Sequence, residues 1–65
     1  MRTLSEIFKS IVKSYNNNET LNFVDLRDLD TLLQGTEIAK SFISTYNNNE
    51  QINYTQLRTL ENLTK

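Results

Sequence analysis

Cysteine, histidine, proline and tryptophan are absent from the 65-residue chain, and glycine occurs only once. Without cysteine and histidine the chain has no disulfides, none of the usual ligands of zinc, haem or iron–sulfur clusters, no Cys nucleophile and no His general base. Any bound metal would therefore be a hard cation, calcium or magnesium, held by oxygen atoms. We expect no enzymatic activity and no cofactor.

An excess of charge of one sign and a long hydrophobic run are also lacking. Seven basic residues balance eight acidic ones to a net charge of −1, and no basic block forms the patch that is typical of nucleic-acid binding. No apolar run approaches the roughly 18–20 residues that span a bilayer, and Glu6 interrupts the chain before a signal-type apolar segment develops. These features predict a cytoplasmic protein, and they disfavour membranes and nucleic acids as partners.

The chain is short enough to form one domain, residues 1–65. A domain of this size buries only about 60% of the surface that its unfolded chain exposes. Nearly every apolar residue is therefore needed for the core, and little is left to line a deep substrate pocket.

An internal repeat is the strongest signal in the sequence. A shift of 31 residues places residues 15–19 (YNNNE) on residues 46–50, which have the same sequence. The correspondence extends over about residues 3–33 in the first repeat and 34–64 in the second, and apolar positions stay apolar. The duplication predicts two structural units that share one core.

The first segment of each repeat has the pattern of an amphipathic helix. Apolar residues recur at the i, i+3, i+4, i+7 spacing, at Leu4, Ile7, Phe8, Ile11, Val12 and Tyr15 in the first repeat and at Ile38, Ala39, Phe42, Ile43 and Tyr46 in the second. Thr3 and Glu6 form the S/T-x-x-E pattern of a capping box. Gly35 suits the left-handed residue that ends the preceding helix.

The second segment of each repeat has a start signal of its own. Asn22 and Asn53 are predicted N-caps, followed three residues later by Asp25 and Gln56 as in a capping box. Further apolar residues give each helix about three turns. The preceding Asn runs tolerate a positive φ and end the first helix of each repeat.

These elements predict an all-α fold of four short helices. Each amphipathic helix is too short to be stable alone in water, so the helices must bury their apolar stripes against one another. We expect two tandem helix-loop-helix repeats that pack about a pseudo-twofold axis.

Positions that differ between the repeats indicate where the halves have different roles. Val24, Asp25 and Asp28 align with uncharged polar residues in the second repeat, and we expect them to face solvent or a partner. Asp25, Asp28 and Asp30, with Arg27 among them, form an acidic stretch on one predicted helix, and such a stretch is often a solvated face. We assign Val24, Asp25, Asp28 and Asp30 as candidate protein-binding residues.

About 13 residues in each repeat resemble the calcium loop of EF-hand proteins, and in particular the duplicated loop-helix units of dockerin modules. That pattern supplies oxygen ligands at alternate loop positions and at position twelve. The resemblance places these positions at Ser14, Asn16, Asn18, Thr20, Asn22 and Asp25, and in the second repeat at Thr45, Asn47, Asn49, Gln51, Asn53 and Gln56. It implies a metal site with Asn16, Asn18, Asn22 and Asp25 among its ligands. The first set keeps one carboxylate and the second none, so the charge count favours Asn-rich turns over calcium sites.

Three classes of function remain open. The first is a small protein-binding module, an accessory regulator or inhibitor of a larger protein; its composition, rich in Asn, Ile, Lys and Thr, is typical of small bacterial and phage proteins. A homodimer is also open. The second is a divalent-ion (calcium) binding module of the EF-hand or dockerin kind. The third is a small DNA-binding regulator, for which the second helices offer Arg27 and Arg58. We favour the first class, with a protein partner.

Overall fold

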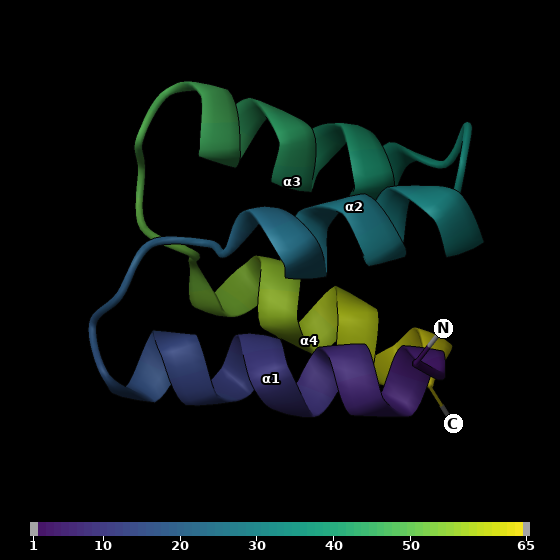
Figure 1. Ribbon diagram of the computed structural model, residues 1–65, viewed down its shortest axis with the longest axis horizontal. Coiled ribbons are helices and arrows are strands. Elements are labelled where there is room, and N and C mark those ends of the chain that lie inside the picture. Colours follow the sequence, from purple (N-terminus) through teal and green to yellow (C-terminus); the bar gives the residue numbers. More distant parts are fainter. Residues whose placement is uncertain (1, 65) are drawn as a thin grey trace.

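The computed structural model describes residues 2–64 and contains four helices in that range. Figure 1 shows their arrangement: α1 (Leu4–Asn16), α2 (Phe23–Leu32), α3 (Glu37–Asn47) and α4 (Tyr54–Leu63). Both Asn-rich loops lie at one end of the bundle, and the α2–α3 connection lies at the other end with the two termini. The predicted all-α fold of four short helices is confirmed.

Each helix packs against two others. α1 and α3 both contact α2 and α4, so the packing pairs are α1 with α2, α3 with α4, α2 with α3 and α1 with α4. If the two halves of the chain are exchanged, the α1/α2 pair becomes the α3/α4 pair, and the α2/α3 pair becomes the α1/α4 pair. This is the packing pattern that the predicted twofold relation between the repeats requires.

The two Asn-rich loops contact each other through equivalent residues. Thr20 and Gln51, which are 31 residues apart, form an isolated antiparallel β-bridge. The Gln51 side-chain amide also donates a hydrogen bond of 2.9 Å to the backbone oxygen of Asn18. Asn18 and Asn49 have φ of 58° and 55°, as predicted for residues that end a helix without glycine. The loops therefore form one joined end of the molecule.

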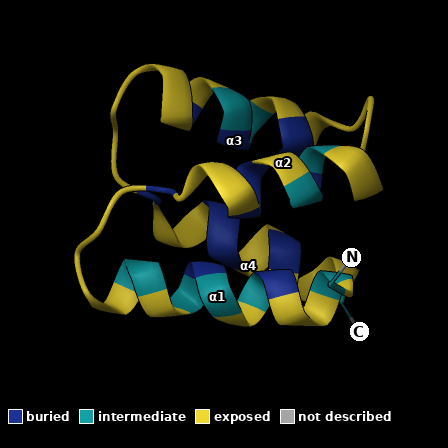
Figure 2. Ribbon diagram, viewed as in Figure 1, coloured by how far each residue is buried: buried dark blue, intermediate teal, exposed yellow. Residues whose placement is uncertain are grey.

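The core is built from matched positions of the two repeats. The buried apolar cluster consists of five equivalent pairs: Ile7 and Ile38, Ile11 and Phe42, Leu21 and Ile52, Leu26 and Leu57, and Leu29 and Leu60. In Figure 2 the buried residues lie on the helix faces that are turned toward the other helices. One shared core from two repeats was predicted, and the burial pattern agrees with it.

Three of the predicted helix starts and ends form as expected, and one differs. The Thr3–Glu6 capping box is present, and so is the box at the start of α4. Gly35 has a φ of 83° at the end of α2. The predicted box between Asn22 and Asp25 is wrong: Asn22 caps α2 by accepting a hydrogen bond of 2.7 Å from the backbone N–H of Val24. Asp25 is occupied by other partners, which are described below.

The capping box of α1 makes stability depend on pH. The backbone N–H of Thr3 donates to Glu6 at 3.0 Å, and this hydrogen bond is the main reason why the pKa of Glu6 lies below its ordinary value of 4.5. Because a pKa lowered by folding stabilises the folded state above the unfolded pKa, this contribution is lost as the pH falls through the lowered value. Glu6→Gln keeps an acceptor but does not titrate. We expect it to flatten the fall of Tm between about pH 5 and pH 3; equal slopes for the two proteins would contradict this.

Among residues 2–64 no helix has both the length and the apolar character needed to cross a membrane.

Candidate functional site

A polar group is buried at the same place in each repeat. Asp25 and the equivalent Gln56 are 3% and 6% exposed. Asp25 accepts a hydrogen bond of 2.9 Å from the hydroxyl of Ser10. The amide of Gln56 donates to the equivalent hydroxyl, Ser41, at 2.7 Å and to Thr45 at 2.8 Å. Each repeat thus links its two helices by a part-buried hydrogen bond between this buried group and a serine.

Arg2 explains why one of these groups is charged and the other is neutral. Its guanidinium contacts Asp25 at 2.7 Å and Asp28 at 2.9 Å, and the hydrogen bond to Asp25 is the main cause that raises the pKa of Arg2. The position equivalent to Arg2 in the second repeat is Leu33. A buried carboxylate needs a paired cation, so the half without an arginine has a neutral amide instead.

The candidate protein-binding residues do not form one exposed face. The expectation that Asp25 faces solvent is wrong, because the side chain is buried and paired with Arg2. Asp28 is brought to the same guanidinium, and its side chain is only 13% exposed. Val24 is 47% exposed and Asp30 is half-buried, and neither contacts Arg2. The structure therefore divides these four residues into an internal ion-pair cluster and two surface positions.

The residues of the alternative metal site are also divided. Asn16, the last residue of α1, and Asn18 in the first loop are exposed, whereas the side-chain oxygen of Asn22 caps α2. Both carboxylate oxygens of Asp25 accept hydrogen bonds, from Arg2 and Ser10. Within residues 2–64 no group of three or more acidic side chains is placed to hold a metal ion. Calcium binding stays a prediction from the sequence.

A groove lies between α1 and α4, on the outer side of the core. It has a volume of about 410 Å³. Phe8, Val12 and Tyr15 line it from α1, and Tyr54, Leu57 and Arg58 line it from α4. Phe8, Val12 and Tyr15 are only partly buried against the core. The groove walls therefore combine apolar and aromatic side chains with the polar side chains of Asn16, Arg58 and Glu61.

A second hollow continues from this groove into the joined loop end. It has a volume of about 480 Å³ and shares Tyr15, Asn16 and Tyr54 with the groove. The two loops add amide side chains and the carboxylate of Glu19, and no lysine or arginine lines it. We call this hollow the loop pocket. The ring of Tyr54, at 63% exposure, borders both the groove and the loop pocket.

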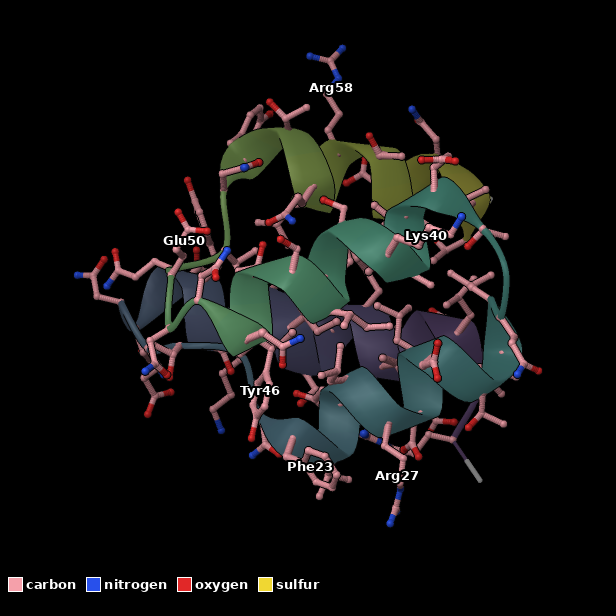
Figure 3. All side chains as sticks on the ribbon, turned by 90° about the horizontal axis from the view of Figure 1, so that it is seen from above. Phe23, Arg27, Lys40, Tyr46, Glu50 and Arg58 are labelled. Atoms are coloured by element: carbon pink, nitrogen blue, oxygen red, sulfur yellow. The ribbon has the colours of Figure 1, made fainter. Side chains whose placement is uncertain are left out.

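On the corresponding surface of the other half, two aromatic rings contact each other. Phe23 and Tyr46, the equivalents of Tyr54 and Tyr15, have ring centroids 5.9 Å apart and planes tilted by 48°. Figure 3 shows them side by side next to the α3–α4 loop. Ala39 stands where the first repeat has Phe8. The molecule therefore has a groove with aromatic residues between α1 and α4, and a pair of contacting aromatic rings between α2 and α3.

The groove was not predicted from the sequence. Tyr15 belongs to the predicted apolar stripe of the first helix and packs against the core, whereas Tyr54 is exposed. The composition of the two loop regions could have indicated a binding surface. Residues 15–23 and 46–54 contain all three tyrosines and eight of the nine asparagines of the chain. Tyrosine with asparagine is the residue mixture of many antibody paratopes.

The two arginines of the DNA-binding alternative point away from each other. In Figure 3, Arg27 and Arg58 extend from opposite sides of the molecule. A single copy therefore does not present both to one groove of a duplex. DNA reading stays a prediction that the placement of these residues does not favour.

Comparisons with protein-family models, with curated proteins and with solved structures found no match to this chain.

Proposed function

We propose that the chain is a small non-enzymatic protein-binding module, an accessory regulator or inhibitor of a larger protein, and that its binding surface is the α1/α4 groove with the adjoining loop pocket. One observation carries the proposal: the exposed ring of Tyr54 stands between a groove with apolar and aromatic residues on both of its helices and a polar pocket, and the two share Tyr15. An apolar centre beside polar groups that fix orientation is the usual anatomy of a protein interface.

The residue types support a protein partner. Aromatic residues are enriched at interface cores because they bury a large area with few rotatable bonds, and lysine is depleted there. The groove and the loop pocket contain Phe8, Tyr15 and Tyr54 and no lysine. Exposed aromatic side chains of this kind are the residues that most often dominate binding energy.

The scaffold supports the proposal as well. The groove is formed by two helices whose inner faces are fixed by the shared core, so little conformational entropy is lost when a partner binds. The α2 surface is a weaker choice, because two of its four candidate residues, Asp25 and Asp28, are already bonded to Arg2. Val24 and Asp30 remain as the alternative surface on that helix.

The proposal is tested by affinity capture of tagged variants from a lysate of the source organism, with quantitative mass spectrometry. We expect one stoichiometric protein that Tyr54→Ser loses by at least about tenfold, as for an interface hot spot. Phe23→Ser is the matched control, because Phe23 is the equivalent aromatic residue of the other repeat and is similarly exposed, at 57%. Circular dichroism verifies that both variants are folded.

The same experiment separates the two surfaces. Val24→Ala with Asp30→Ala is expected to leave capture unchanged. Loss of capture in this double variant with normal capture by Tyr54→Ser would assign the interface to α2 instead. Analytical sedimentation of the purified chain tests whether it forms a homodimer. Self-association that Tyr54→Ser abolishes would identify the partner as a second copy of the chain.

A further inference from the structure

The loop pocket contains hydrogen-bond acceptors that have no partner within residues 2–64, beside two tyrosines. Among the described residues, no cation pairs with the carboxylate of Glu19 and no donor reaches the side-chain oxygen of Gln51. Tyr15 and Tyr54 line the same hollow. The pocket therefore offers a negative charge, an amide oxygen and two tyrosine side chains to an incoming group.

The charge around the pocket has one sign. Residues 15–23 and 46–54 contain two charged side chains, Glu19 and Glu50, and both are acidic. Arg58 lines the adjoining groove and not the loop pocket, and it extends away from the molecule in Figure 3. An anionic group would meet repulsion here, whereas a cation would be attracted.

The two cationic side-chain groups, the guanidinium of arginine and the ammonium of lysine, differ in shape and in hydrogen-bonding capacity. A guanidinium has five N–H donors, no acceptor and a planar face that stacks on aromatic rings. An ammonium satisfies the charge but does not stack in this way. Tyrosine rings with a carboxylate and amide oxygens therefore match an arginine side chain better than a lysine side chain.

We infer that the loop pocket between the two Asn-rich loops receives an arginine side chain of the protein partner, held by Glu19 and by the rings of Tyr15 and Tyr54. The inference rests on the proposed function and names its partner chemistry: a segment with an arginine next to apolar residues, the apolar residues filling the α1/α4 groove. Since the pocket and the groove share Tyr15 and Tyr54, adjacent residues of one segment reach both.

The test is an NMR titration of the ¹⁵N-labelled full chain with N-acetyl-arginine methylamide. N-acetyl-citrulline methylamide is the control ligand, because it has nearly the same shape without the charge. We expect saturable shifts at the amides of residues 15–19 and 51–54, with a dissociation constant on the order of millimolar. We expect citrulline to bind more weakly by about threefold to fivefold, as for a partly exposed charge contact.

Glu50→Gln provides a matched variant, since Glu50 is equivalent to Glu19 and does not line the pocket. Glu19→Gln is expected to weaken arginine binding by about threefold to fivefold, and Glu50→Gln to leave it unchanged. Equal binding of citrulline, or equal effects of the two variants, would overturn the inference, because either result would show that no specific guanidinium contact exists.

The two proposals fail in different ways. If partner capture depends on Tyr54 but not on Glu19, the protein-binding function stands and the arginine pocket is wrong. If N-acetyl-arginine methylamide binds through Glu19 while no captured protein depends on Tyr54, the pocket stands and the proposed interface is wrong.

Discussion

Phe42→Ala is expected to leave the chain largely unfolded at room temperature. Phe42 is the largest fully buried side chain, at 0% exposure, and it lies in the cluster that both repeats share. Removal of a buried phenylalanine ring costs about 3–5 kcal/mol, because apolar contacts are lost and a cavity remains. The single core of a domain this small supplies at most about 3–5 kcal/mol of stability, so the loss is comparable to the whole. Urea unfolding followed by circular dichroism measures the effect.

Phe8→Ala is the matched control for this prediction. It removes the same ring from a residue that is only partly buried and that lines the α1/α4 groove. We expect a loss of about 1–2 kcal/mol, because less apolar area leaves contact and solvent fills the space. A Phe8→Ala variant as unstable as Phe42→Ala would show that Phe8 belongs to the core and that the groove is not a preformed surface.

Asp25→Ala is expected to destabilise the fold by about 1–3 kcal/mol, the usual cost of leaving buried hydrogen-bond partners unsatisfied. The change removes the acceptor of the Ser10 hydroxyl and one of the two carboxylates bound by Arg2. Asp30→Ala removes the same residue type from the same helix, outside the Arg2 cluster, and is expected to stay within about 0.5 kcal/mol of the parent. Thermal unfolding of both variants provides the comparison.

A double-mutant cycle isolates the contact itself. Arg2→Ala is expected to lower Tm in the parent, where it leaves the buried Asp25 carboxylate without its cation. In the Asp25→Ala background its effect is expected to be smaller, since only the contact to Asp28 remains to be lost. Additive effects of the two changes, or equal stabilities of Asp25→Ala and Asp30→Ala, would contradict the role given to this ion pair.

Much of the fold follows from local patterns in the sequence. The spacing of apolar residues predicted four helices, and the Thr3–Glu6 box and Gly35 marked a start and an end that the structure has. The repeat predicted which apolar positions share the core, since equal positions in two copies of one unit have equal neighbours. Such signals are available from the sequence because each depends on residues only a few positions apart or on the alignment of the halves.

The misassigned residues are those whose partners lie far away in the sequence. Asp25 was expected at the surface because it differs from Gln56, but the difference arises from Arg2, which is 23 residues away and has no counterpart in the second repeat. Phe23 and Tyr54 follow the apolar pattern, yet they lie at helix ends where the core no longer covers them. The groove depends on the packing of the first helix against the last, which no local pattern specifies.

The most direct test of the proposed binding surface is site-specific photo-cross-linking in the source cells. The photoreactive amino acid benzoylphenylalanine is placed at position 54 in one variant and at position 23 in another, two equivalent aromatic positions of similar exposure. A partner in the α1/α4 groove predicts a specific adduct from position 54 and little or none from position 23. An adduct from position 23 alone, with none from position 54, would contradict the account and assign the interface to the side of α2 and α3.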